Sequence, residues 1–153
     1  MLKICKKFSE LDFDRLLKVY DLDTYEQNSL AIELYDYLHQ VFFRDKDAFY
    51  ALWEIESNYV SALRMEPYQD GYLITAVQTR KSERRKGYAE CLLRAVMSSL
   101  QIQGNCPIYV HIHKKNVASI QLHMKCGFTI TADHAVFIDG TVSAGSYTLG
   151  WTK

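Results

Sequence analysis

The spacing of apolar residues along the chain changes from the period of a helix to that of a strand and back. After a short predicted strand at 2–5, Ser9 is an expected helix N-cap, because a serine followed by helically spaced apolar residues is a common helix start. Those apolar residues are Phe13, Leu16, Leu17 and Tyr20. A second amphipathic helix is predicted over about 25–43.

The middle of the chain has the composition of strands. Segments 48–54, 59–66 and 71–80 are rich in β-branched and aromatic residues, which favour strands. Polar turn sequences at 56–58 and 68–71 separate them, and such turns join neighbouring antiparallel strands. The pattern predicts an antiparallel meander.

From Gly87 onward the helical period returns, and the predicted helix has one apolar face: Ala89, Leu92, Leu93, Val96 and Leu100. A strand at 107–113 follows, and then a helix that Asn116 caps and that ends at Cys126, with Gly127 at the left-handed position after it. Two strands, 128–138 and 145–151, are predicted to meet around 139–140. The predicted order is β-α-α-β-β-β-α-β-α-β-β.

Composition narrows the class of protein. A length of 153 residues predicts a single domain, 1–153. The 18 basic residues balance the 18 acidic ones, so net charge favours neither nucleic acid nor a membrane surface as a partner. No apolar run resembles a signal peptide or a membrane span. The four cysteines form no C-x-x-C pair, which predicts reduced thiols in a cytoplasmic protein and no metal site.

The segment from 74 to 93 carries the predicted chemistry. An extended run leads into a basic turn, Arg84-Arg85-Lys86-Gly87-Tyr88-Ala89, and then directly into a helix. The start of a helix presents unpaired backbone N–H groups, which suit a phosphate, and a glycine lets an anion approach the backbone. A solvated basic loop is the plainer interpretation. Dinucleotide-binding and P-loop motifs are excluded, because their further glycines and the Gly-Lys-Ser/Thr triplet are absent.

Two motifs together resemble the GNAT superfamily of N-acetyltransferases. Arg84-x-x-Gly87-x-Ala89 is similar to the family's (Gln/Arg)-x-x-Gly-x-(Gly/Ala) motif. A downstream segment, Asn116-x-x-Ser119-x-x-Leu122-His123-x-Lys125-x-Gly127-Phe128, resembles its Asn-x-x-Ala-x-x-Leu-Tyr-x-Lys-x-Gly-Phe segment. The resemblance covers nearly the whole chain, although the first 50 residues match only in element order. It implies an α/β fold with a mixed, mostly antiparallel sheet of six to seven strands flanked by about four helices.

The resemblance implies acetyl-CoA as cosubstrate, with no metal. In the family, backbone amides of the glycine-bearing turn bind the pyrophosphate, and the pantetheine arm lies along the preceding strand. An asparagine at the start of the later helix commonly touches the cofactor. The implied cofactor-binding residues are Val77, Gln78, Thr79, Arg84, Arg85, Lys86, Gly87, Tyr88, Ala89 and Asn116.

The implied reaction is direct attack of a primary amine, on a small molecule or a peptide, upon the acetyl thioester. His123 stands where the family usually has a tyrosine that protonates the departing thiolate, and a histidine can serve as that acid. Gln78 stands where close relatives often carry glutamate, so the general base stays open among His111, His113, Glu54 and Glu66. These two departures keep a second function open, a catalytically degenerate sensor of acyl-CoA. Homodimers are frequent in the family.

Overall fold

A computed structural model describes residues 1–22, 28–101, 104 and 106–152. The chain forms two compact units. The first unit comprises Met1–Met65 and Ala76–Val96, and the second comprises Glu66–Thr75 and Met97–Lys153. Strands β3 (Asn58–Tyr68) and β4 (Gly71–Thr79) and helix α3 (Tyr88–Gln101) each contribute residues to both units.

The main sheet has seven strands in the order β1-β2-β3-β4-β5-β9-β6. They are β1 (Leu2–Cys5), β2 (Phe49–Ile55), β3 (Asn58–Tyr68), β4 (Gly71–Thr79), β5 (Ile108–His113), β9 (Ser146–Trp151) and β6 (Thr129–Ala132). Strands β7 (Ala135–Val136) and β8 (Val142–Ser143) form a separate two-stranded sheet. The α-helices in the described residues are α1 (Phe13–Val19), α2 (Ser29–Gln40), α3 (Tyr88–Gln101) and α4 (Val117–Lys125). The expected fold class is confirmed.

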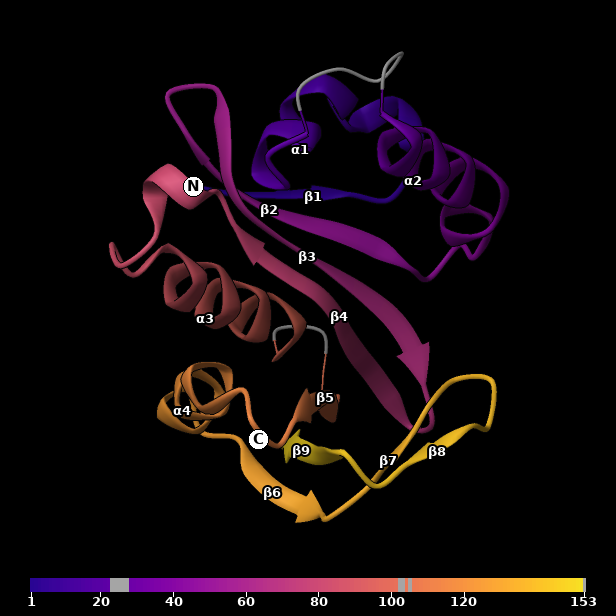
Figure 1. Ribbon diagram of the computed structural model, residues 1–153, viewed down its shortest axis with the longest axis vertical. Helices are drawn as coiled ribbons and strands as arrows, with labels where there is room; N and C mark the ends of the chain where they lie inside the picture. Colours follow the sequence, from indigo (N-terminus) through magenta and orange to yellow (C-terminus); the bar gives the residue numbers. More distant parts are fainter. Residues whose placement is uncertain (23–27, 102–103, 105, 153) are drawn as a thin grey trace. The chain divides into compact units, whose positions relative to one another are not determined.

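In the first unit, α1 and α2 pack on one face of β1, β2 and β3 (Figure 1). Strands β1 and β2 are antiparallel, as are β2 and β3. Side chains of alternate strand residues point to the same face, and here they form an apolar cluster with the two helices: Cys5, Leu16, Val19, Leu38, Phe42, Tyr50, Leu52, Tyr59 and Ala62. The opposite face is buried as well, because Ala51 and Leu63 are fully inaccessible.

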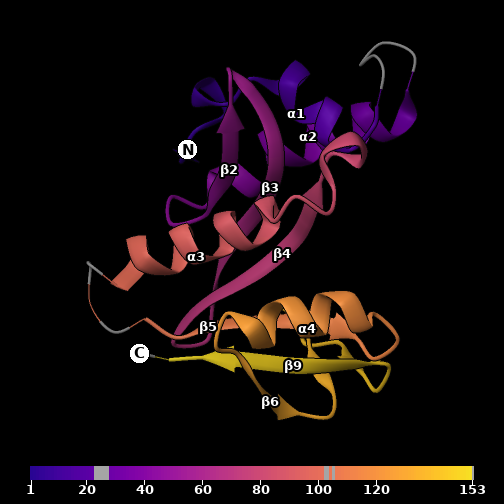
Figure 2. The same cartoon turned by 90° about the vertical axis from the view of Figure 1, so that its left-hand side faces the viewer.

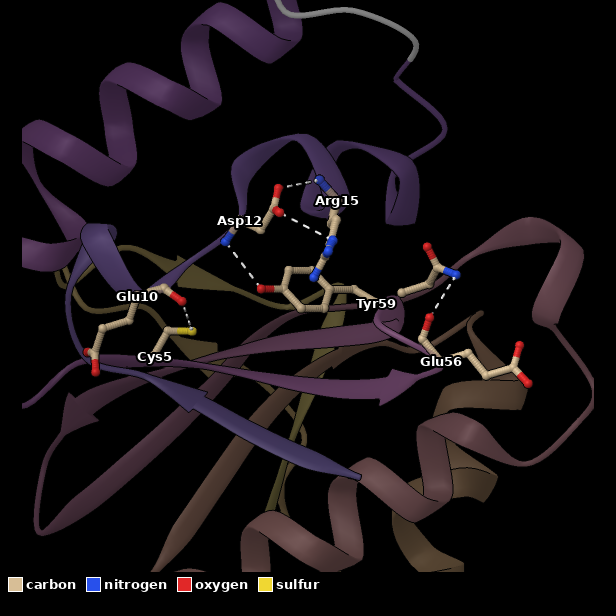
Figure 3. Close-up of polar contacts among 7 residues, drawn as sticks. Cys5, Glu10, Asp12, Arg15, Glu56 and Tyr59 are labelled. Atoms are coloured by element: carbon tan, nitrogen blue, oxygen red, sulfur yellow. Dashed lines mark hydrogen bonds and ion pairs between the residues drawn. The ribbon is translucent and has the colours of Figure 1, made fainter.

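Helix α1 begins later than its sequence pattern suggests. The predicted N-cap, Ser9, is wrong: it lies in a short 3₁₀ turn, Phe8–Glu10. Asp12 caps the helix instead, because its carboxylate accepts a hydrogen bond from the N–H of Arg15 at 3.1 Å. The N–H of Asp12 in turn donates to the hydroxyl of Tyr59 at 3.1 Å (Figure 3). A long-range contact to β3 therefore fixes where this helix starts.

Helix α2 starts at Ser29, with Asn28 as its N-cap. The predicted start near residue 25 lies outside the described residues. The helix ends at Gln40, before the predicted end at 43, because the chain turns into a 3₁₀ helix at Phe42–Arg44. That turn brings Phe42 into the apolar cluster.

The predicted meander of β2, β3 and β4 is confirmed. The β2–β3 turn is tight, with Glu56 and Ser57 both at positive φ, as a two-residue hairpin loop requires.

In the second unit, β5 pairs in parallel with the first part of β4 and antiparallel with β9, which pairs antiparallel with β6. Helix α4 lies next to these strands (Figure 2). Its predicted ends are confirmed. Asn116 accepts from the N–H of Ser119 at 3.2 Å, and Gly127 has a φ of 99°. The N–H groups of Gly127 and Phe128 donate to the carbonyls of Met124 and His123, which closes the helix as a Schellman motif.

The predicted single strand over 128–138 is wrong, because the chain changes partners within it. Residues up to Ala132 pair with β9, whereas Ala135 and Val136 pair with β8. Between them, the hydroxyl of Thr148 donates to the carbonyl of His134 at 2.7 Å. No helix in the described ranges is both long enough and apolar enough to cross a membrane.

The capping geometry makes a testable prediction about α1. Replacing Asp12 with alanine removes the cap, and we expect the free energy of unfolding to fall by about 1 kcal/mol. Asp12→Asn keeps an acceptor and should retain most of that stability. Ser9→Ala is the matched control and should stay within about 0.5 kcal/mol of the wild type. Chemical denaturation measures all three, and equal losses for Asp12→Ala and Ser9→Ala would contradict the assignment.

Candidate cofactor-binding turn and active-site residues

The turn between β4 and α3 has the geometry of an anion-binding site. After a 3₁₀ helix at Lys81–Glu83, Arg85 and Gly87 adopt positive φ angles of 65° and 82°. The first helical hydrogen bond runs from Cys91 N–H to Gly87 O at 3.0 Å. Within the described part of the chain, the backbone N–H groups of 85–89 have no acceptor. Five successive amides are therefore available at the positive end of a helix dipole.

Gly87 leaves space in front of these amides. A Cβ placed on it would meet no atom within 4 Å, so the glycine is not required by packing. Its φ of 82° is one that side-chain-bearing residues rarely adopt. A residue with a side chain here would strain the backbone and would occupy the open space in which an anion would lie.

The basic side chains of the turn are partly engaged with the protein itself. Arg84 donates from Nε to the carbonyl of Thr79 at 3.2 Å, and Lys86 pairs with Glu83 at 2.8 Å. The hydrogen bond and the charge of Glu83 raise the pKa of Lys86. Arg84 to Gly87 are all exposed. An anion at this turn would therefore meet mainly backbone N–H groups, with side-chain charge in a supporting role.

The end of β4 is anchored by a buried serine of β3. Ser61 is fully inaccessible. Its hydroxyl donates to the carbonyl of Gln78 at 3.0 Å and lies 3.0 Å from the hydroxyl of Thr79. Nearby, the N–H of Arg80 donates to the carbonyl of Val60 at 2.8 Å. These bonds hold the strand end from which the turn departs.

Ala76 is a site feature that sequence reasoning missed. It has a φ of 53° inside β4, and such a conformation is uncommon for a residue other than glycine, asparagine or aspartate. The bend stands directly before Val77, Gln78 and Thr79, which are half-buried. Alanine has no preference for this conformation, so nothing in the sequence signalled it.

The predicted residues fall into two groups. Val77 to Thr79 and Arg84 to Ala89 belong to the first unit, whereas Asn116 and His123 belong to the second. Asn116 is exposed and uses its side-chain oxygen to cap α4. His123 is on the same helix and is completely buried.

The hydrogen bonding of His123 defines its tautomer. Its Nδ1 lies 2.7 Å from the carbonyl of Ser119, and because a carbonyl only accepts, Nδ1 carries the proton. The other nitrogen, Nε2, is buried and has no partner among the described residues. Burial lowers the pKa of His123, and the bond to Ser119 only partly opposes this. The neutral ring therefore has a free lone pair on Nε2.

The remaining candidates for the general base differ in environment. His111 packs edge-on against Tyr68 and Phe137, with ring centroids 5.6 and 5.3 Å apart. Its Nε2 is buried without a partner in the described structure, and burial lowers its pKa. His113 is exposed and accepts from the N–H of Lys115 at 3.1 Å. Glu66 accepts from the hydroxyl of Thr75 at 3.2 Å.

The second unit also contains a cavity of about 210 Å³. The hydroxyl of Tyr109 at its wall donates to Asp70 at 2.8 Å. Asp139, at the last turn, accepts from the N–H of Thr141 at 2.9 Å. That bond is ordinary turn chemistry.

Comparison with known proteins identifies the family. A model of the acetyltransferase (GNAT) family matches residues 12–128. A chloroplastic GCN5-related N-acetyltransferase 6 from Arabidopsis thaliana is 42% identical over 50 residues, which are 33% of this chain and 17% of that protein. The chain thus aligns with about a sixth of that curated relative.

Solved structures share the fold. The Campylobacter jejuni N-acetyltransferase PseH, in complex with acetyl coenzyme A, matches with a TM-score of 0.72 and 12% identity over 100% of this chain and 99% of that one. The ribosomal-protein-S18-alanine N-acetyltransferase from Escherichia coli matches with a TM-score of 0.68 and 11% identity, covering 99% and 94%.

The family model covers most of the chain, and the solved structures share its fold. The chain belongs to the acetyltransferase (GNAT) family. The resemblance carried by the two motifs is therefore confirmed.

The buried imidazoles make a prediction about pH. The folded chain resists protonation of His111 and His123, whereas the unfolded chain takes up these protons near the ordinary histidine pKa of about 6.5. The unfolded state then binds more protons, so the free energy of unfolding should be greatest above about pH 6.5 and should fall on acidification below it. In His123→Phe this fall should be smaller, as denaturation at pH 7.5 and 5.5 would measure. An unchanged fall would contradict the environment described for His123.

Proposed function

We propose that the protein transfers the acetyl group of acetyl-CoA to a primary amine. The observation that carries the proposal is the set of five backbone amides at 85–89 with no acceptor in the described chain. Family membership supports it, as does the acetyl-CoA complex of the similarly folded PseH. A solvated basic loop would need neither the left-handed Arg85 nor the open space at Gly87.

In this proposal the pyrophosphate of CoA accepts hydrogen bonds from the amides of the turn. Oxyanions bind well at such sites, because several N–H groups and the helix dipole act on one charge. The pantetheine arm lies along Val77 to Thr79, where the strand is half-buried. The carbonyl of Thr79 is already bonded to Arg84, so we assign the arm's hydrogen bonds chiefly to Val77 and to the N–H of Thr79. Asn116 has its amide nitrogen left for the cofactor while its oxygen caps α4.

The chemistry requires a neutral amine and a proton for the departing thiolate. A lysine-like amine is neutral in only about one molecule in a thousand near pH 7, so a base or a dry site must assist. We assign proton transfer to Nε2 of His123, because Nδ1 is held by Ser119. A buried imidazolium is destabilised, so it is a strong acid toward a thiolate. Because the resting ring of His123 is neutral, Nε2 must first take up a proton during the reaction, for example from the attacking amine, before it can protonate the thiolate.

Gly87→Val should abolish binding of acetyl-CoA, because its side chain would fill the space in front of the amides. Gly140→Val is the matched control: Gly140 also has a positive φ, 87°, and open space around it. Both variants incur similar backbone strain, of about 1–2 kcal/mol, so both should lose similar stability. Isothermal titration with acetyl-CoA would distinguish them. Wild-type affinity in Gly87→Val would refute the assignment of the turn.

Acetyl transfer itself is tested by thiol release from acetyl-CoA with a panel of amines: amino acids, amino acid amides, polyamines and peptides with free N-termini. We expect turnover above the hydrolysis background with at least one of these classes, and we expect Gly87→Val to abolish it. Binding of acetyl-CoA without turnover of any amine would replace the proposal with a sensor of acyl-CoA.

A further inference from the structure

Arg64 is a charged side chain of the first unit that neither sequence motif includes. It lies on β3 directly opposite Tyr50 of β2, so it points to the face that α1 and α2 cover. Its guanidinium carbon lies 5.0 Å from the ring centre of Tyr37 and 5.9 Å from that of Phe42. The Nε atom of Arg64 is buried and has no hydrogen-bond partner in the described structure.

The surroundings of Arg64 provide rings and hydroxyls but no carboxylate. The hydroxyls of Tyr20 and Tyr50 bond to each other, and the charge of Arg64 acts on both by lowering their pKa values against the larger effect of burial. Among the residues that the structure describes, no aspartate or glutamate forms an ion pair with Arg64. A guanidinium stays charged at any physiological pH. Partial burial without a counter-ion is costly for such a group, and an anionic ligand would relieve that cost.

The register of the strands places Arg64 beside the bend in β4. The N–H of Arg80 donates a hydrogen bond to the carbonyl of Val60. In an antiparallel pair, residue numbers rise along one strand as they fall along the other. Counted from this bond, and allowing for the irregularity that the left-handed Ala76 introduces into β4, Arg64 lies within about one residue of Ala76 along the strand pair. Both residues belong to the first unit. Arg64 therefore lies next to the left-handed residue that precedes Val77 to Thr79, where the proposed function puts the end of the pantetheine arm.

We propose that Arg64 binds the carboxylate of the acceptor, and that the acceptor is a small amino acid-like molecule with an amine and a carboxylate. This inference rests on the proposed acetyl transfer. A guanidinium binds a carboxylate through two parallel hydrogen bonds. The rings of Tyr37 and Phe42 pack against the guanidinium of Arg64 and hold it in place. The fixed positive charge also disfavours a polyamine acceptor, since like charges repel. The same charge favours the neutral form of a nearby amine.

Matched substrates test the inference through activity. Each amino acid is compared with its primary amide, which keeps the amine and the side chain but lacks the negative charge. The amide has the larger neutral fraction of amine, so a preference for the acid opposes intrinsic reactivity. We expect wild-type kcat/KM for the best acid to exceed that for its amide by about 10- to 100-fold. The preference for the acid should shrink in Arg64→Lys, which keeps the positive charge but loses the two parallel N–H donors of the guanidinium. It should vanish in Arg64→Met.

Arg44→Met is the matched control, because Arg44 is an exposed arginine at the end of a 3₁₀ helix of the same unit. It should keep the wild-type preference. Thermal melting and acetyl-CoA binding establish that each variant is folded. An acid-to-amide ratio near one in the wild type, a ratio unchanged in Arg64→Met, or a better rate with spermidine would each overturn the inference.

A binding measurement separates this inference from the proposed function. N-acetyl amino acids and their amides are titrated calorimetrically into the protein saturated with CoA. We expect only the acids to bind, with affinity reduced about 10- to 100-fold in Arg64→Met and unchanged in Arg44→Met. Binding of acids through Arg64 without turnover of any amine would keep the anion site and reject acetyl transfer. Turnover of amines with equal binding of acids and amides would keep acetyl transfer and reject the anion site at Arg64.

Discussion

The buried hydroxyl of Ser61 is the interaction on which the geometry of the turn depends. It binds the carbonyl of Gln78 and contacts the hydroxyl of Thr79, so it fixes the end of β4 against β3. The 3₁₀ helix, the left-handed Arg85 and the five open amides all follow from that end. Arg84 reinforces it by donating to Thr79. A backbone site keeps its shape only when the strand that enters it is rigid, and here the Ser61 hydroxyl holds that strand end together with Arg84 and the backbone bond from Arg80 to Val60.

Positively charged side chains occur in two different environments in this molecule. The sequence has no net charge, and the basic run at 84–86 is exposed, with two of its three side chains bonded to the protein. The anion binding that we propose at the turn would therefore depend mainly on oriented N–H groups. Arg64 is the opposite case: a single guanidinium that lies beside two neighbouring aromatic rings and is partly withdrawn from solvent. An isolated charge in such surroundings acts more strongly than an exposed one, because water screens it less.

Local sequence accounted well for the elements whose signals are local. Helix α3 has a complete apolar face, so its presence was predictable, and α4 has both a capping asparagine and a closing glycine, so its limits were predictable. The predictions were wrong where contacts between residues far apart in the chain determine where an element begins or ends. Ser9 has the right chemistry for an N-cap, yet the hydroxyl of Tyr59, 47 residues farther along the chain, holds the N–H of Asp12 and moves the helix start. The strand predicted at 128–138 divides because its second part pairs with β8, and alternation within one strand cannot reveal its partner.

The sequence by itself determined the family and the position of the glycine-bearing turn, because a glycine at the start of a helix and the spacing of two motifs are properties of contiguous residues. It also supplied the candidates for proton transfer. Only the tertiary structure decided the tautomer of His123, the bend at Ala76 and the anchoring of β4 by Ser61. It also decided the surroundings of Arg64, which forms no ion pair with any residue that the structure describes. Each of these depends on which atoms surround a side chain after folding. Contacts of that kind join residues that are far apart in the chain, and composition and periodicity do not encode them.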